Sequence, residues 1–82
     1  MRVEIVYALP GDVFMEQLEL PEQITVQHAI ASSTLLQSHP EIDFDLNKIG
    51  IYGKLVSANA VLKDNDRIEI YRPLTAAKKP RN

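Results

Sequence analysis

Cysteine is absent from the 82 residues of this chain. Its absence excludes disulfides, thiolate metal sites, iron–sulfur clusters and cysteine nucleophiles. The only glycines are Gly11, Gly50 and Gly53, and they match neither a P-loop nor a dinucleotide-binding fingerprint. The sequence has no apolar run of about 18 residues and no visible secretory signal. We therefore expect a cytoplasmic protein that is not inserted in a membrane.

The charges are unevenly distributed along a chain whose formal net charge is −2. Residues 1–45 hold eight acids and one base, whereas residues 46–82 hold three acids and eight bases. This asymmetry allows two interpretations. Neighbouring elements of the fold complement one another, or the surface is bipolar and steers a partner.

The N-terminal third of the chain reads as a β-hairpin. Residues 2–8 alternate in polarity, and their inward face consists of Val3, Ile5 and Tyr7. The sequence Pro10-Gly11-Asp12 is typical of a turn, and residues 13–20 read as the returning strand. Glu16 interrupts the apolar face of this second strand, which predicts a bulge there.

One amphipathic helix is predicted over residues 26–37. Thr25 is a suitable N-cap, and apolar or small residues recur on one helical face at Val26, Ala29, Ile30 and Ser33. The helix is expected to end before Pro40, because the residue before a proline avoids helical backbone.

The second half of the chain predicts three more strands and a tail. They span residues 49–52, a short segment at 55–56, and residues 67–71, with a turn at Gly53-Lys54 and Asn65 in left-handed backbone. This order predicts an α+β fold of the β-grasp (ubiquitin-like) type, a mixed four- to five-stranded sheet with one helix packed on one face. The first and last strands then lie side by side in the centre. The domain is expected to span residues 1–74, and residues 75–82 to form a flexible basic tail.

Four stretches of the sequence resemble one known family, the bacterial RnfH proteins, some of which are called RatB. They are Arg2-Val3-Glu4-Ile5-Val6-Tyr7-Ala8-Leu9-Pro10, the segments Pro40-Glu41-Ile42-Asp43 and Asn47-Lys48-Ile49-Gly50-Ile51-Tyr52-Gly53-Lys54, and Leu62-Lys63-Asp64-Asn65-Asp66-Arg67-Ile68-Glu69-Ile70-Tyr71-Arg72-Pro73-Leu74. Asn65 departs from the glycine usual in this family, and the tail is shorter than the Arg-rich end that its members often carry.

The resemblance implies a ubiquitin-like β-grasp fold and carries over no catalytic residue. The family takes its name from a genomic association with the Rnf membrane electron-transport complex. Other members are similar to the partner of a small toxin-like protein. A protein that binds the Rnf complex and an antitoxin-like or regulatory protein are therefore both implied.

Two chemistries of β-grasp proteins do not match this sequence. Protein modifiers and sulfur carriers need a C-terminal Gly-Gly, whereas this sequence ends Pro80-Arg81-Asn82, so we expect neither conjugation nor sulfur carriage. A plant-type ferredoxin needs four cysteines.

Metal binding and catalysis find no support in the remaining motifs. The segment 43–47 resembles the start of a calcium loop, but Lys48 and Lys54 occupy the positions that need glycine and glutamate. His28 and His39 lack further ligands at a matched spacing, and Ser32 and Ser33 have no evident relay. We predict no enzyme, and no catalytic, cofactor or metal-binding residue.

Nucleic-acid binding is a weaker alternative. The basic residues of the second half suit phosphate contacts: Lys48, Lys54, Arg67, Arg72, Lys78, Lys79 and Arg81. Acids are interleaved with them, and the sequence pI is about 5.6. We therefore place this function behind protein binding.

The expected binding surface is the sheet face that the helix leaves open. Its candidate docking residues are Val6, Tyr52, Tyr71, Arg67, Glu4 and Glu69. Exposed tyrosines among charges suit a protein interface. The same residues also suit cross-strand pairs that only stabilise the sheet, by about 0.2–1 kcal/mol each. The predicted function is a non-catalytic adaptor that binds another protein.

The docking interpretation makes a testable prediction. Replacement of Tyr71 by alanine together with Arg67 by glutamate is expected to abolish partner binding and to leave the fold intact. The measurement is affinity capture from a native lysate, with circular dichroism as the check on folding. Equal capture by the double variant and the wild type contradicts the prediction.

Overall fold

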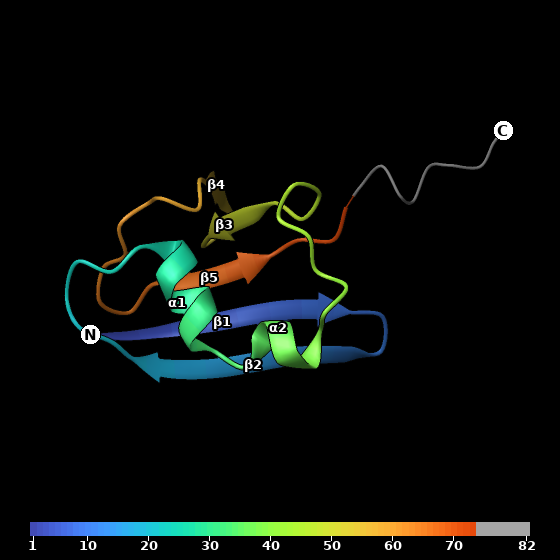
Figure 1. The fold of residues 1–82 in the computed structure, drawn as a ribbon, viewed down its shortest axis with the longest axis horizontal. Helices are drawn as coiled ribbons and strands as arrows, with labels where there is room; N and C mark the ends of the chain where they lie inside the picture. The colour runs from blue at the N-terminus through green and yellow to red at the C-terminus, as the bar shows by residue number, and fades with distance from the viewer. Residues whose placement is uncertain (74–82) are drawn as a thin grey trace, which may run out of the picture.

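The computed structural model describes residues 1–73 as a five-stranded sheet with two short helices over one face (Figure 1). The elements follow in the order β1 (Arg2–Leu9), β2 (Asp12–Glu19), α1 (Val26–Ser32), α2 (Leu35–Ser38), β3 (Ile49–Ile51), β4 (Lys54–Val56) and β5 (Arg67–Ile70). The expected end of the domain at residue 74 and the basic tail after it lie outside the described residues.

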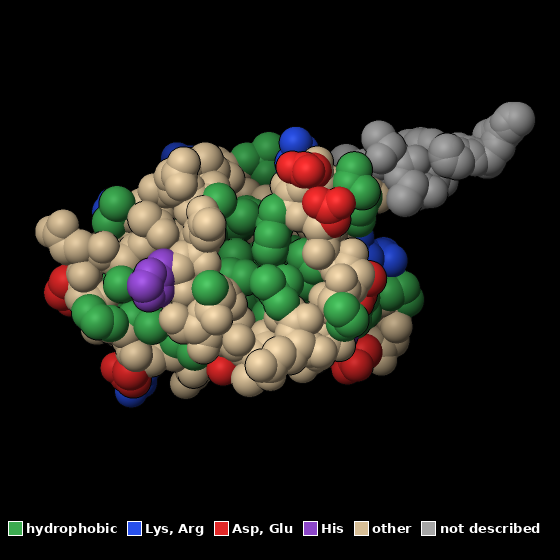
Figure 2. All heavy atoms as spheres, in the orientation of Figure 1, with side chains coloured by type: hydrophobic (Ala, Val, Ile, Leu, Met, Phe, Trp, Pro, Cys, Tyr) green, Lys and Arg blue, Asp and Glu red, His purple; other side chains and the backbone are tan. Residues whose placement is uncertain are grey.

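The sheet has the strand order β2-β1-β5-β3-β4 and is mixed. The central strands β1 and β5 are parallel, and every other neighbouring pair is antiparallel. Parallel neighbours need a long crossover, which the helices and the β3–β4 hairpin supply here. The prediction that the first and last strands lie side by side, with helical structure on one face, is confirmed. Viewed from the helix side, hydrophobic side chains remain visible in the middle of this face (Figure 2).

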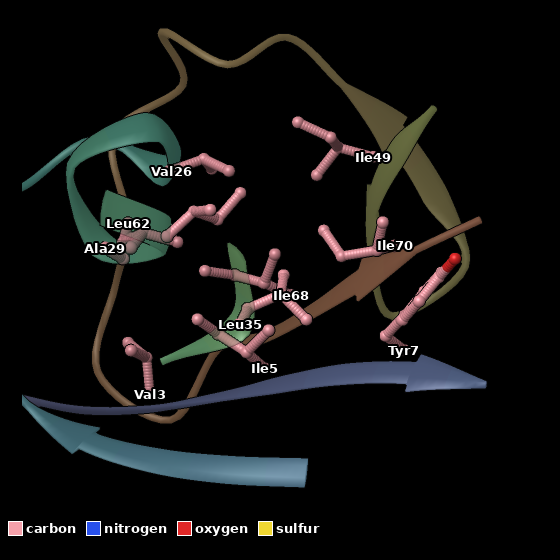
Figure 3. Close-up of a cluster of buried hydrophobic side chains, with 11 residues drawn as sticks. Val3, Ile5, Tyr7, Val26, Ala29, Leu35, Ile49, Leu62, Ile68 and Ile70 are labelled. Atoms are coloured by element: carbon pink, nitrogen blue, oxygen red, sulfur yellow. The ribbon is translucent and has the colours of Figure 1, made fainter. Parts of the chain in front are cut away.

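The hydrophobic core lies between the helices and the sheet (Figure 3). Its buried side chains are Val3, Ile5, Tyr7, Val26, Ala29, Ile30, Leu35, Ile49, Leu62, Ile68 and Ile70. The inward residues predicted on the first strand, Val3, Ile5 and Tyr7, are all among them. Ile5 and Ile68 are direct partners across β1 and β5, and both are fully buried. Burial of a side chain of this size stabilises the folded state by about 1.5–3 kcal/mol.

The β1–β2 hairpin runs without a bulge, so the predicted bulge is wrong. Its pairing is unbroken from Arg2 opposite Glu19 to Leu9 opposite Asp12. Between them, Pro10 and Gly11 form the turn, and Gly11 has a φ of 75° that glycine adopts without steric cost.

The prediction of one continuous helix over residues 26–37 is wrong, because the segment forms two short helices, α1 and α2. Its start is as predicted, because Thr25 caps α1 by accepting from the His28 N–H at 3.2 Å. Serine causes the break: the Ser33 hydroxyl donates to the Ile30 carbonyl at 2.6 Å and accepts from the Leu35 N–H at 3.1 Å. Such side-chain bonds compete with those of a helix.

Glu16, the residue that suggested a bulge, holds the second helix instead. Its Oε1 accepts from the backbone N–H of Thr34 at 3.0 Å and from the Thr34 hydroxyl at 2.9 Å. The acid therefore stays on the helix side of β2 in regular strand geometry, and it connects the edge of the sheet to the start of α2.

The turns in the second half of the chain lie where the sequence predicts them, except for the β3–β4 turn. Asn65 has the predicted left-handed backbone, with a φ of 72°. The β3–β4 turn consists of Tyr52 and Gly53, with φ of 48° and 83°, and Lys54 already pairs with Ile51. The predicted turn at Gly53-Lys54 is one residue too late, because Tyr52 adopts a backbone uncommon for a bulky residue.

The Glu16 link can be tested by its effect on stability. Glu16→Ala is expected to lower the free energy of unfolding by about 1 kcal/mol, since it removes the acceptor that caps α2. Urea unfolding measures this change. Glu22→Ala is the matched control, because the Glu22 side chain is 77% exposed and should change stability little. Equal effects of the two substitutions would contradict a capping role.

Candidate functional site

The sheet face opposite the helices is the candidate site, and we call it the open sheet face. Side chains alternate along each strand, so the register places one set of residues there. The set is Arg2, Glu4, Val6, Ala8, Val13, Met15, Gln17, Glu19, Gly50, Leu55, Arg67, Glu69 and Tyr71. Tyr52, in the β3–β4 turn, adjoins this face.

One end of the open sheet face is polar, and its polar groups bind one another. Arg67 Nε lies 3.0 Å from Glu4 Oε1, across the central strand pair. The Arg67 guanidinium also lies 5.9 Å from the centre of the Tyr52 ring. The Tyr52 hydroxyl donates to the Asn65 carbonyl at 2.7 Å. The Tyr52 side chain is therefore held through the face of its ring and through its hydroxyl.

The carboxylate of Glu69, in the middle of the face, also has hydrogen-bond partners within the chain. Its Oε1 accepts from the Gly53 N–H at 2.8 Å and from the Tyr71 hydroxyl at 2.6 Å. The second bond fastens the aromatic ring across the sheet. Together with burial and the nearby negative charge, this bond raises the pKa of Tyr71 to about 12.

The Tyr71 ring lies directly on Gly50. A Cβ atom at Gly50 would lie 2.9 Å from both Cε2 and Cζ of the ring, closer than van der Waals contact allows. Glycine is therefore required at this position for close approach and not for an unusual φ. The ring replaces the missing side chain and covers the backbone of β3.

The remaining part of the face is apolar and exposed, and we call it the apolar patch. It consists of Val6, Ala8, Val13, Met15, Leu55 and the ring of Tyr71. Met15 is opposite Val6, and Val13 is opposite Ala8. Exposed fractions reach 54% for Met15 and 66% for Leu55. Ala8, Leu55 and Tyr71 also line a hollow of about 990 Å³ at one end of the sheet.

All six residues predicted for docking lie on or beside this face, but they differ in whether their side chains are already bonded within the chain. Val6 belongs to the apolar patch, whereas the charges of Glu4, Arg67 and Glu69 and the hydroxyls of both tyrosines have intramolecular partners. Sequence reasoning missed Val13, Met15 and Leu55. The signal for the first two was the odd-numbered alternation of β2, which the expected bulge obscured.

A second apolar hollow lies on the helix side, where Figure 2 shows hydrophobic side chains in the middle of the face. It measures about 390 Å³ and is lined by Gln27, Ile30, Ala31, Leu36, Phe44, Ile49 and Ala58. It exists because α1 ends after seven residues and leaves part of the core layer uncovered. Leu36 and Phe44 are 39% and 37% exposed.

His39 and the acidic connector, residues 41–47, make contacts that stabilise the fold. His39 packs edge-on against the rings of Tyr7 and Phe14, and its Nδ1 lies 3.4 Å from Glu41. Burial, followed by the charge of Glu41, raises the pKa of Tyr7. Among residues 1–73, no three histidine or acidic side chains gather as metal ligands.

Asn47 anchors the acidic connector and was not singled out from the sequence. Its side chain is the buried polar group of the core region. Its amide donates to the Tyr71 carbonyl at 3.0 Å, and its oxygen accepts from the Asp43 N–H at the same distance. The resemblance of residues 43–47 to a calcium loop therefore reflects a turn fastened to the end of β5.

The described part of the chain contains no helix with the length and apolar character needed to cross a membrane.

Comparison with known proteins identifies close relatives. The profile described as "RnfH family Ubiquitin" matches residues 1–81. Protein RnfH of Paraburkholderia phymatum is 51% identical over 74 residues, which are 90% of this chain and 67% of that protein. Protein RnfH of Haemophilus influenzae is 47% identical over 76 residues, which are 93% of this chain and 74% of that protein.

Solved structures show the same fold. A domain-swapped dimer of protein HI0395 from Haemophilus influenzae is 47% identical, with a TM-score of 0.60, and the match covers 90% of this chain and 92% of that chain. SAMP1 from Haloferax volcanii has a TM-score of 0.70 at 13% identity, covering 92% of this chain and 98% of that one. The latter likeness concerns the ubiquitin-like fold alone.

The bond between Tyr71 and Glu69 predicts a pH effect at the alkaline end. The folded pKa of about 12 exceeds the ordinary value of about 10. Its contribution to stability is therefore complete below pH ~10 and is lost as the pH rises through the folded pKa. Titration of tyrosinate absorbance should show a late step that Tyr71→Phe removes and Tyr52→Phe retains. Glu69→Gln should move this step to lower pH; an unmoved step would contradict the assignment.

Proposed function

The chain belongs to the RnfH family of ubiquitin-like proteins, and from this premise we propose that it is a non-catalytic adaptor that binds another protein through the apolar patch. The observation that carries the proposal is the exposure of Val13, Met15 and Leu55 on a face whose charged groups already have partners within the chain. Exposed apolar side chains that gather on one face are typical of interaction sites.

The internal pairing around the patch gives it a fixed shape. Glu4, Arg67 and Glu69 are held by bonds within the sheet, so a partner meets a preorganised surface and orders few side chains. The paired charges form a polar rim at one end, and the apolar side chains form the part that excludes water. An apolar centre with a polar rim is the usual anatomy of a protein interface.

The non-catalytic part of the proposal is supported by how the candidate chemical groups are used. The Ser32 hydroxyl donates to the His28 carbonyl, and the Ser33 hydroxyl donates to the Ile30 carbonyl. His39 is packed between two aromatic rings. These groups stabilise the helices and the connector.

Two classes of partner follow from the family: a component of the Rnf complex, or a small toxin-like protein for which this chain acts as a regulator. Both are proteins that a cytoplasmic adaptor meets. Self-association is a competing outcome, because a relative at 47% identity has been solved as a domain-swapped dimer. Sedimentation equilibrium therefore precedes the binding experiment and establishes the oligomeric state.

The proposed function is tested by substitutions that place a positive charge in the apolar patch. Met15→Lys and Leu55→Lys are expected to weaken capture of the partner from a native lysate by about tenfold or more, as for residues central to an interface. Both side chains are more than half exposed, so each substitution should change the free energy of unfolding, measured in urea, by less than about 0.5 kcal/mol.

Leu36→Lys is the matched control, since it adds the same charge to the apolar hollow on the helix side. It should capture the partner as the wild type does. Loss of capture with Leu36→Lys alone would move the binding site to the helix side. Retention by all three variants would contradict binding through either apolar surface.

A further inference from the structure

The β2 strand forms one edge of the sheet and is a much longer edge than the other (Figure 1). β2 spans eight residues, whereas the opposite edge strand, β4, spans three and begins with Lys54. Short strands and lysines protect an edge from pairing with other chains. β4 is protected in both ways, and β2 in neither.

The direction of the hydrogen bonds shows which groups of β2 point away from the sheet. Met1 and Leu20 exchange hydrogen bonds in both directions, and bonded pairs alternate along an antiparallel ladder. The even-numbered residues of β2 therefore bond to β1. The N–H and C=O groups of Met15, Gln17 and Glu19 point outward, and the described residues supply no strand that pairs with them.

The outward edge is regular over its length. No proline and no bulge interrupts residues 12–19. Among residues 1–73, only Asp12 blocks it, at its beginning, where the Asp12 carboxylate accepts from the Val13 N–H at 2.7 Å. A straight, unpaired edge of this kind is a template for an added strand.

The same residues place the edge beside the apolar patch. Met15 and Gln17 turn their backbone outward and their side chains toward the open sheet face. A strand added to β2 would place alternate side chains next to Val13 and Met15, and would extend the apolar patch by one strand. Its other side chains would lie beside Glu16 on the helix side.

The charge of the edge indicates the chemistry of the strand that fits. β2 carries three acids, Asp12, Glu16 and Glu19, and no base. Glu19 is paired with Arg2 of β1 at 2.8 Å, so the negative charge of the edge comes mainly from Asp12 and Glu16 on the helix side. A second copy of β2 would bring further acids to the acidic edge, which opposes pairing. An extended segment with basic residues is complementary to it.

We propose that the partner contributes an extended segment of alternating apolar and basic residues, which pairs with the outward edge of β2 and extends the sheet. This inference rests on the proposed function, because the added strand uses the apolar patch for its apolar side chains.

The test uses a peptide-display library of random decapeptides as the probe and the full chain as the target. Selected peptides should alternate apolar and basic residues. When they bind, amide hydrogen exchange at Met15, Gln17 and Glu19 should slow, whereas exchange at Phe14 and Leu18, already bonded to β1, should change little. An empty selection overturns the proposal, as does binding without protection at the three outward amides.

Gln17→Pro removes one outward N–H and should weaken peptide binding by about tenfold, through the lost hydrogen bond and the bulk of the ring. Proline is tolerated on an edge strand where the N–H faces solvent, so the fold should persist. Gln17→Thr is the matched control, because it changes the side chain and keeps the N–H.

The two proposals fail in different ways. Weaker binding with Met15→Lys and unchanged binding with Gln17→Pro would overturn strand addition and leave the adaptor function standing. Unchanged binding with both would overturn both. Concentration-dependent dimerisation that Gln17→Pro abolishes would assign the edge to a second copy of the chain, which also overturns the proposal.

Discussion

The parallel pairing of β1 with β5 is the interaction on which the rest of the structure depends. It joins Ile5 to Ile68 at the centre of the core, and Glu4 to Arg67 on the opposite face, over 63 residues of sequence. β2 pairs with β1, β3 pairs with β5, and β4 is added to β3. The helices cover the inner side of this pair, and the apolar patch and its polar rim lie on the outer side. Core and candidate site are therefore opposite faces of the same two strands.

The parts of this arrangement that follow from local periodicity could be predicted from the sequence. Alternation identified the buried residues of β1, Thr25 marked the start of α1, and Asn65 marked a left-handed turn. The break between α1 and α2 was not predicted, because Ser33 is compatible with an amphipathic helix and the competing hydrogen bonds depend on geometry. Glu16 was misread for a related reason: its partner, Thr34, lies in another element.

The candidate site was harder to predict than the fold, since it is assembled from strands that are distant in sequence. Tyr71 and Glu69 were assigned to the correct face, but their mutual bond and the close approach to Gly50 depend on the position of β3. Leu55 lies in a short strand, and only the register opposite Gly50 places it on the open sheet face, within the apolar patch. Exposure of a side chain is a property of the assembled sheet, which a pattern within one strand does not determine.

The central position of the last strand has a consequence for synthesis of the protein. A chain emerging from the ribosome exposes the β1–β2 hairpin first, but the hairpin has no neighbour on its inner edge until Arg67–Ile70 has left the exit tunnel. Pairing over so long a separation closes slowly compared with local contacts. The nascent domain therefore presents two unpaired strand edges and an uncovered apolar layer for most of its translation. This interval is when chaperones or proteases have access to it.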